Sequence, residues 1–500
     1  MSDAWLQAFS AVFAPYNLVV MLAASLFGLF VGAVPGLTAT MATALLVPVT
    51  FFMAPIPAIA AIVTATAMAI FSGDIPGCLL RMPGTPASAA YTDEAYAMTR
   101  KGQAELALGA GLVFSAIGGL FGTAVLMVAA PTLAEFALNF SSFEYFWLVL
   151  MGLTCAVFIS TDRPLKGLVT LFLGLLVASV GLNNPAAFPR FTFGNTELLG
   201  GIGLIPLMIG MFAVAEIIRY AVALESDPLV AEQHIGNVFS GMWALARRYP
   251  KQILRGSTLG TVVGALPGAG ADIAAWMSYA TSKRFSKEPE KFGTGHVEGI
   301  VESGAANNSA LAGAWIPALV FGIPGDSITA IVIGVLYMKN MNPGPTLFTT
   351  HPERIYSVFL LFIVANLIML PLGWLAIKAA KRILRVPRDV LMPVILLFCV
   401  VGAFAINNTA FDVGVMLVAG LVAYLLEENG FPISPLILGV VLGGMLEENF
   451  VSSMIKANGS LLAFFSRPIA AALGALTLAI WLLPAARGLL ARRRALRASA

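Results

Sequence analysis

Residues 5–73 contain no Asp, Glu, Lys, Arg or His. A membrane-spanning helix needs about 20 predominantly apolar residues, so this stretch is long enough for two or more spans. A soluble protein could not bury a run of this length. The whole chain agrees, because 59% of it is hydrophobic and only 11% is charged, against roughly 25% charged residues in soluble domains. We therefore expect an all-α polytopic membrane protein with about 10–12 transmembrane passages.

Two pairs of similar phrases interrupt the apolar segments. Residues 28–36 read GLFVGAVPG and residues 260–268 read GTVVGALPG. A second pair follows in the same order, with MPGTP at residues 82–86 and IPGDS at residues 323–327. Proline removes a backbone donor and glycine weakens a helix, so each phrase predicts a broken or re-entrant helix. The repeated order predicts two repeats, for which we prefer inverted topology because it brings both breaks to a shared midplane site.

The charged residues suggest how the chain is organised. We predict a first membrane repeat at residues 1–220, a polar linker at 221–255, a second membrane repeat at 256–485 and a basic cytoplasmic tail at 486–500. The basic clusters should be cytoplasmic under the positive-inside bias. The charged loop at 283–302 lies on the same side if the segment containing Pro267 turns back, and on the opposite side if it spans. The N-terminus lacks the basic segment of a cleaved signal peptide, so we expect the first apolar segment to remain as an anchor.

The breaks are the candidate substrate site. The first turn of a half-helix has free backbone N–H groups and a positive dipole end, which favour a carboxylate without a buried lysine. The predicted substrate-binding residues combine these breaks with neighbouring small or polar groups: Gly36, Thr38, Gly84, Thr85, Ser88, Gly268, Ala269, Gly270, Asn308, Gly325 and Ser327. The alternative is structural, because glycine and proline also permit close helix packing or a kink, and Ser or Thr also caps helices.

Carboxylates and amides in apolar segments are candidates for ion coupling. An ionised carboxylate in a membrane segment needs a cation or a proton as its partner. We predict ion-coupling roles for Asp272, Asn307 and Asp326. A helix cap or an exposed loop aspartate is the alternative for the two carboxylates, and N-capping is the alternative for Asn307. Asp74 and Asp412 are equally compatible with a membrane-edge position and with a functional one.

Signatures of enzymes and metal sites are missing from the sequence. It has no His-Glu-x-x-His and no phosphate-binding loop. An intramembrane aspartyl protease would carry Gly-x-Gly-Asp, but Ile323 stands at the first glycine position before Gly325 and Asp326. The histidines lie in polar surroundings and the cysteines lack metal-site spacing. We expect no catalytic residue, no metal site and no cofactor, and the net charge of +3 gives no reason to expect nucleic acid binding.

Together these motifs resemble the large membrane subunit of the bacterial tripartite tricarboxylate transporters, the TctA type, over nearly the whole chain. The resemblance rests on four stretches: GAVPGLT at residues 32–38, PGTPAS at 83–88 with the following residues 93–104, GTVVGALPGAGAD at 260–272 and EGIVESGAANN at 298–308. Each stretch alone is unspecific, whereas the set of four is highly specific.

The resemblance implies a secondary transporter of carboxylates in the bacterial inner membrane. Such a chain is the translocator, working with a small membrane subunit and a periplasmic solute-binding protein, and its energy comes from a co-transported cation, Na+ or H+. The family handles diverse carboxylates, so tricarboxylates and related organic acids are the expected substrates. Arg81 could bind a carboxylate or lie at the cytoplasmic edge. A passive anion channel or facilitator and an intramembrane enzyme are the alternatives to a symporter.

Overall fold

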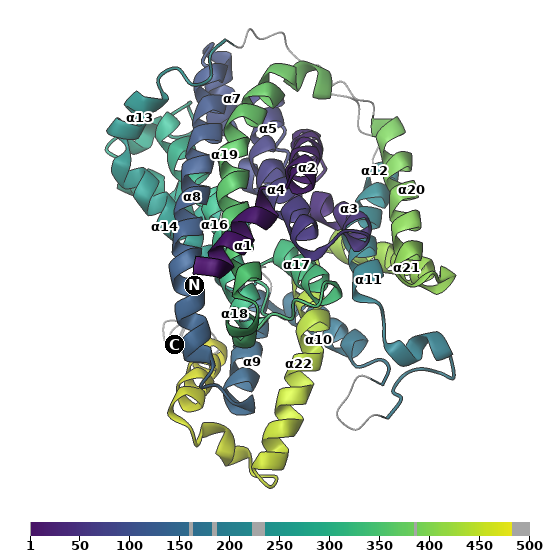
Figure 1. Cartoon of the computed structure of the whole chain (residues 1–500). Helices are drawn as coiled ribbons and strands as arrows, with labels where there is room; N and C mark the ends of the chain where they lie inside the picture. Colours follow the sequence, from purple (N-terminus) through teal and green to yellow (C-terminus); the bar gives the residue numbers. More distant parts are fainter. Residues whose placement is uncertain (1, 160–163, 183–187, 223–235, 385–387, 483–500) are drawn as a thin grey trace, which may run out of the picture. The chain divides into compact units, whose positions relative to one another are not determined.

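The structure is a computed structural model, and it describes every residue except 1, 160–163, 183–187, 223–235, 385–387 and 483–500 (Figure 1). The described residues form helices and no strand beyond one isolated β-bridge between Gly181 and Arg190. They divide into two compact units. The larger unit contains Met1–Ala137 and Gly203–Asn429, and the smaller contains Leu138–Ile202 and Gly430–Ala500. Each unit therefore takes residues from both predicted repeats.

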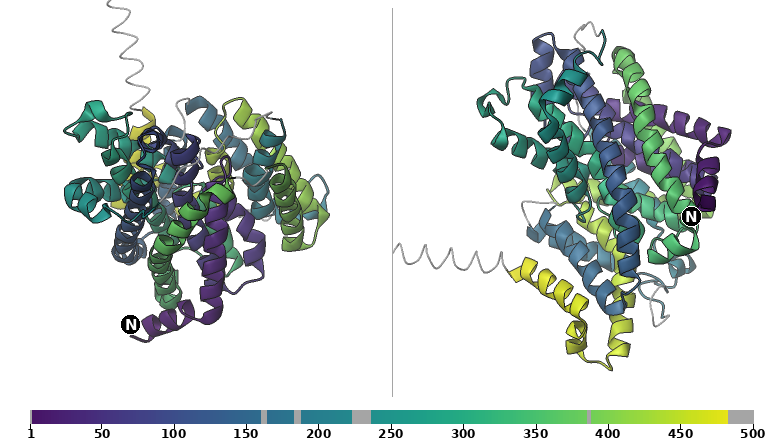
Figure 2. Two further views of the ribbon diagram at one scale, coloured as in Figure 1. Left: turned by 90° about the horizontal axis from the view of Figure 1, so that it is seen from above. Right: turned by 60° about the vertical axis from the view of Figure 1, so that its left-hand side comes forward.

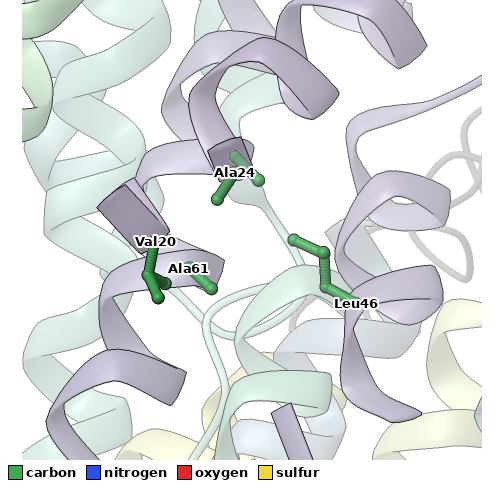
Figure 3. Close-up of a cluster of buried hydrophobic side chains, with 5 residues drawn as sticks. Val20, Ala24, Leu46 and Ala61 are labelled. Atoms are coloured by element: carbon green, nitrogen blue, oxygen red, sulfur yellow. The ribbon is translucent and has the colours of Figure 1, made fainter. Parts of the chain in front are cut away.

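The larger unit begins with eight α-helices. They are α1 (Ser2–Val12), α2 (Pro15–Ala33), α3 (Ala39–Phe51), α4 (Pro55–Ser72), α5 (Asp74–Leu80), α6 (Pro86–Ala89), α7 (Thr92–Arg100) and α8 (Ala104–Ala137). Small and apolar side chains join the first of these helices. Val20 and Ala24 of α2, Leu46 of α3 and Ala61 of α4 lie in one buried cluster (Figure 3).

The chain returns to the larger unit with a second series of helices. They are α11 (Leu204–Ile209), the π-helical turn η2 (Gly210–Val214), α12 (Ala215–Val222), α13 (Met242–Arg248), α14 (Pro250–Gly264), α15 (Gly270–Phe285), the 3-10 turn η3 (Pro289–Lys291), α16 (Val297–Phe321), α17 (Ser327–Met338), α18 (Pro345–Thr350), α19 (Pro352–Ile383), α20 (Arg388–Asn407) and α21 (Ala410–Glu428). The long helices α8 and α19 lie side by side (Figure 2). They approach closely because Gly119 of α8 leaves room for Asn366 of α19.

The smaller unit is built from segments far apart in the sequence. It contains α9 (Ser142–Ile159), α10 (Pro164–Ala178), the 3-10 turn η1 (Thr196–Gly200), α22 (Ser434–Lys456), the 3-10 turn η4 (Leu461–Phe465) and the apolar helix Pro468–Leu482. A Cβ on Gly174 of α10 would lie 2.0 Å from the Leu436 carbonyl oxygen of α22, so only glycine permits this contact. Trp147 of α9 donates a hydrogen bond of 2.9 Å to the Phe464 carbonyl oxygen.

Among the described residues, eight helical segments are long and apolar enough to cross a membrane. They are Pro15–Ala33, Pro55–Leu80, Ala104–Ala137, Leu204–Val222, Pro352–Ala380, Val390–Asn407, Ala410–Glu428 and Ser434–Lys456. Five shorter apolar helices, two of which are α3 and α17, accompany them in the described part of the chain. The predicted all-α polytopic fold is therefore confirmed. The total of about 10–12 passages and the two repeats stay predictions.

Glycine contacts bring α2 against α4 and α14 against α16 in the same way. A Cβ on Gly28 or Gly32 would lie 2.2 Å from the carbonyl oxygen of Ala65 or Ala69, respectively. On α14, a Cβ on Gly260 would lie 2.3 Å from the Ala306 carbonyl oxygen, and one on Gly264 would lie 2.1 Å from that of Ala310. Small residues at such positions allow membrane helices to pack backbone against backbone. These contacts position the segments that follow, which contain the Pro-Gly phrases.

Candidate functional site

The first Pro-Gly region, residues 35–38 and 83–88, contains the predicted breaks. Helix α2 ends at Ala33 and α3 begins at Ala39. Gly36 between them has φ +89°, a backbone conformation that other residues rarely adopt. Thr38 caps α3 by accepting a hydrogen bond of 3.1 Å from the Met41 backbone. The sequence prediction of a break at this point is confirmed.

The second Pro-Gly region, residues 267–272 and 324–327, has the same kind of break. Helix α14 ends at Gly264 and α15 begins at Gly270, with positive φ angles at Gly268 and Gly270. The Gly268 N–H donates a 2.8 Å hydrogen bond to the Gly325 carbonyl oxygen. A Cβ on Gly270 would lie 2.7 Å from the Asp326 Cβ, so the two halves of this region touch. Ala269 at the N-cap of α15 provides no side-chain cap.

In each region, the turn that comes later in the sequence packs against the helix that precedes the earlier break. A Cβ on Gly84 would lie 2.4 Å from the Gly32 carbonyl oxygen, and a Cβ on Gly325 would lie 2.4 Å from the Gly264 carbonyl oxygen. Gly84 also donates a 3.0 Å hydrogen bond to the Gly73 carbonyl oxygen. The turn and the break are therefore held together by backbone contacts in both regions.

Capping boxes follow both turns. Thr85 accepts a hydrogen bond from the Ser88 N–H while the Ser88 hydroxyl accepts one from the Thr85 N–H, each at 3.2 Å. Asp326 and Thr329 make the same reciprocal pair at the start of α17, at 2.7 and 2.9 Å. Thr85, Ser88 and Asp326 thus cap helices, which is the structural alternative considered above. Ser327 is the first residue of α17.

The two regions meet where α6 packs against α15. The Asp272 carboxylate accepts a hydrogen bond from the Ala87 backbone and lies close enough to Asp326 for the two to repel each other. Trp276 donates a 3.3 Å hydrogen bond to the Pro86 carbonyl oxygen. Asp272 is exposed, whereas Asp326 is half-buried. Residues 84–88, 268–272 and 325–327 therefore come together as one group.

A second contact joins the earlier break of the first region to the later turn of the second region. It is made by α3 and α17, which pack against each other. Lys339, directly after α17, donates hydrogen bonds of 2.8 and 2.7 Å to the Phe51 and Met53 carbonyl oxygens at the end of α3. Gly36 and Thr38 lie at the opposite, N-terminal end of α3. A direct approach of Thr38 to Ala269 stays a prediction.

The two asparagines lie in the middle of α16. This position excludes the N-cap alternative for Asn307, since α16 begins at Val297. Asn308 donates hydrogen bonds to the Ser115 hydroxyl at 2.9 Å and to the Ala67 carbonyl oxygen at 3.4 Å. Asn307 donates one of 3.3 Å to the Tyr91 hydroxyl. Both side chains are buried, and their Oδ1 atoms have no hydrogen-bond partner among the described residues.

Asp74 and Tyr91 were not among the predicted site residues. Asp74 is 5% exposed, and its Oδ1 accepts a 2.6 Å hydrogen bond from the Tyr91 hydroxyl. Sequence reasoning left Asp74 between a membrane-edge and a functional position, and the structure places it inside the larger unit. The only sequence signal for it is a carboxylate that ends the long uncharged stretch. No spacing rule points to Tyr91, which contacts Asn307 from a distant part of the chain.

The remaining charged candidates have structural partners. Arg81 pairs with Asp93, and both side chains are more than 60% exposed, which removes Arg81 from the buried site. Asp412 lies in the first turn of α21 and accepts a 2.8 Å hydrogen bond from Asn407. Two further carboxylates at the ends of apolar stretches are also paired, Glu427 with Arg219 and Glu447 with Arg190. His234 and the basic tail at 486–500 lie outside the described residues.

Glu94 connects α7 to the loop between α15 and α16. Its buried carboxylate accepts hydrogen bonds from the backbone N–H groups of Gly293, Gly295 and His296, and from the Tyr279 hydroxyl at 2.8 Å. Burial and the neighbouring Glu94 carboxylate raise the pKa of Tyr279, so it stays a donor. In the described part of the chain, no three His, Cys, Asp or Glu side chains come together as metal ligands.

Comparison with known proteins identifies the relatives of the chain. The family model described as the tripartite tricarboxylate transporter TctA family matches residues 18–438. A 52.8 kDa protein in the TAR-I ttuC' 3' region of Agrobacterium vitis is 35% identical over 482 residues, which are 96% of each chain. A second protein of that organism, in the TAR-II ttuC' 3' region, is 35% identical over 231 residues, which are 46% of this chain and 96% of the relative. No solved structure matches the chain.

Proposed function

The chain belongs to the tripartite tricarboxylate transporter TctA family, and we propose that it is the translocating subunit of a binding-protein-dependent symporter for carboxylates. It is a multi-pass membrane protein and a subunit of a tricarboxylate transport system. The finer proposal is that it imports tricarboxylates or related organic acids across the bacterial inner membrane by cation symport. Its partners are a small membrane subunit and a periplasmic solute-binding protein.

The observation that carries the proposal is the meeting of the two Pro-Gly regions at α6 and α15. Helix α15 begins without a side-chain cap, and its first backbone N–H groups are the proposed contacts of the anion. Small residues, Ala269 and Gly270, surround this end, which would let a carboxylate approach the backbone. Thr85, Ser88, Asn308 and Ser327 are the proposed neutral polar contacts of the substrate or its ion.

The charges at this place explain why a cation would be needed. Asp272 lies in the first turn of α15 and is close to Asp326 of the neighbouring turn. A carboxylate substrate bound at the same helix end would meet two like charges, and no basic residue lies in the segments 265–282 or 322–338. A cation or a proton would remove this repulsion. We therefore assign Asp272 and Asp326 to ion coupling, and we propose the same role for the buried Asn307 because its Oδ1 has no hydrogen-bond partner among the described residues.

The test is accumulation against a gradient. The chain is reconstituted in proteoliposomes with its two partner subunits, and uptake of labelled carboxylates is measured with an imposed Na+ or H+ gradient. Accumulation above the external concentration that collapses with one ion gradient supports symport. Equilibration without accumulation would identify a passive channel or facilitator, and chemical conversion of the substrate would identify an enzyme.

A further inference from the structure

Three buried polar side chains from three different elements form a hydrogen-bonded network next to the first Pro-Gly region. Asp74 begins α5, the Tyr91 hydroxyl donates to Asp74 Oδ1 at 2.6 Å, and Asn307 Nδ2 donates to the Tyr91 hydroxyl oxygen at 3.3 Å. Tyr91 is the N-cap residue of α7, and Asn307 lies within α16. The exposed fractions of the three residues are 5%, 2% and 0%, respectively. None of the three side chains makes a helix-capping hydrogen bond.

The second carboxylate oxygen of Asp74 has no partner. Oδ2 is buried and accepts no hydrogen bond from the described residues, and Asp74 takes part in no ion pair there. An ionised carboxylate with one oxygen left unpaired inside a membrane protein is costly, and protonation or a bound cation removes the cost. The geometry around Asp74 therefore requires a positive charge that this part of the protein does not supply.

The space at Oδ2 favours a proton over a metal ion. A Cβ built on Gly111 of α8 would lie 2.6 Å from Oδ2, so the backbone of α8 covers this oxygen closely. Hard metal cations gather several oxygen ligands around themselves. A proton needs no added volume and no further ligand, and it turns Asp74 into a neutral acid.

The titratable groups on the surrounding elements do not supply the missing charge. Helix α5 packs against α2, α4, α6, α7 and α8. Tyr91 and Cys78 are the titratable groups that interact with Asp74, and neither carries a positive charge. The other titratable groups of these elements are Tyr16, Asp93, Glu94, Tyr96, Arg100, Glu105 and Glu135. The cation among them, Arg100, is exposed and lies at the end of α7 opposite Tyr91. Asp93 pairs with Arg81, and Glu94 holds the loop after α15.

Asp74 is directly connected to the proposed substrate region. A Cβ on the preceding residue, Gly73, would lie 2.7 Å from the Thr85 Oγ1, and the Gly73 carbonyl oxygen accepts the hydrogen bond from Gly84. At its other end, the hydrogen-bonded network reaches α16. Ala306 and Ala310 of this helix pack against the glycines of α14. A change at Asp74 therefore acts on segments that lead to both Pro-Gly regions.

We propose that Asp74 Oδ2 is a proton-binding site, in which Tyr91 and Asn307 hold the carboxyl and transmit its protonation to both Pro-Gly regions. The inference rests on the proposed transport function and adds to it a proton as the coupling ion at a site separate from Asp272 and Asp326. A proton from one side of the membrane binds Oδ2, and the same proton leaves to the other side. Tyr91 remains protonated throughout as the donor to Oδ1.

The test uses the complete transporter in proteoliposomes with the variants Asp74→Asn, Tyr91→Phe and Asp412→Asn. Asp412 is a matched control, because it is also a buried aspartate in the first turn of a helix but has Asn407 as a partner. With Asp74→Asn we expect substrate exchange to continue while proton-driven accumulation falls by about tenfold or more. With Tyr91→Phe the ionised carboxylate loses its donor, so we expect the pH midpoint of driven uptake to move upward. Asp412→Asn should leave both measurements unchanged.

The outcomes separate this inference from the proposed function. If the wild-type transporter accumulates no substrate with any ion gradient, the proposed function fails. If the wild type is driven by a Na+ gradient without dependence on pH, symport stands and the proton site is wrong. Proton-driven accumulation by Asp74→Asn at the wild-type level also overturns the inference. If Asp74→Asn loses exchange as well, Tyr91→Phe decides, because an unchanged pH midpoint contradicts a proton on Asp74.

Discussion

The two Pro-Gly regions share their backbone contacts and differ in their side chains. In the first region the turn at Gly84 packs against Gly32, and in the second the turn at Gly325 packs against Gly264, with the same 2.4 Å approach to a carbonyl oxygen. The cap after the turn is a neutral threonine in the first region and Asp326 in the second. Similar backbone geometry therefore surrounds groups of different charge.

The carboxylates are also distributed differently. In the second region Asp272 is exposed and lies beside Asp326 at the start of a half-helix. In the first region the nearest carboxylate within an apolar segment is that of Asp74. It accepts a hydrogen bond from Tyr91, and the backbone at Gly111 lies close to its other oxygen. One region therefore has an exposed carboxylate, whereas the carboxylate of the other is buried within the protein.

The largest effect is expected from Gly84→Ala and Gly325→Ala. Each new Cβ would lie 2.4 Å from a backbone oxygen that cannot move without moving a helix, and such overpacking costs about 3 kcal/mol. We expect both variants to lose folded protein in the membrane to a similar extent, measured by detergent-solubilised yield and thermal unfolding. Gly414→Ala is the control, because nothing lies within 4 Å of its Cβ. Tolerance of one variant and not the other would break the structural equivalence of the regions.

The next effect concerns the charges of the second region. Asp272→Asn and Asp326→Asn should keep substrate exchange and lose driven accumulation by about tenfold, because neutral side chains remove the need for a cation. Exchange and accumulation are measured separately with sodium and proton gradients. Loss of both activities would point to a binding or folding role instead of a coupling role alone. Wild-type ion dependence in both variants would move the coupling role to backbone carbonyl oxygens and Asn307.

A smaller effect is expected from Thr85→Ala. Loss of a threonine cap alone costs about 1 kcal/mol of stability, so we compare it with Thr409→Ala, which removes the cap of α21. If Thr85 also contacts substrate or its ion, its variant should reduce transport by several times more than Thr409→Ala at equal expression. Equal transport in the two variants would restrict Thr85 to capping.

The smallest effect on function is expected from a cysteine pair at Thr38 and Ala269. Both residues are N-caps of half-helices at the earlier breaks. We expect oxidative cross-linking in the membrane in at least one transport state, detected by mass spectrometry of the linked peptides. A cysteine pair at Thr38 and the exposed Thr349 serves as the negative control. If no state or substrate condition gives a cross-link, the two earlier breaks do not share one site.

Local features of the sequence determined much of the fold. The uncharged stretch at residues 5–73 predicts membrane helices because lipid excludes charge. Proline and glycine predict the breaks at Pro35 and Pro267, since they act on the backbone hydrogen bonds of their own turn. The caps at Thr85 and Asp326 also depend on residues only three positions away. Such effects can be read without knowledge of the packing.

The partners of the buried polar groups were decided by the tertiary structure. Asn307 meets Tyr91 because α16 packs beside the start of α7, and these residues lie far apart in the sequence. The smaller unit likewise joins residues 138–202 to residues after 430. A helix can be recognised from the groups within one turn of each residue, but a contact between helices depends on which glycines let backbones approach. For this reason the sequence indicated only that Asp74 is a charge in an apolar segment. The packing of the helices decided that Asp74 contacts Tyr91 and lies close to Gly111, and that its Oδ2 has no partner among the described residues.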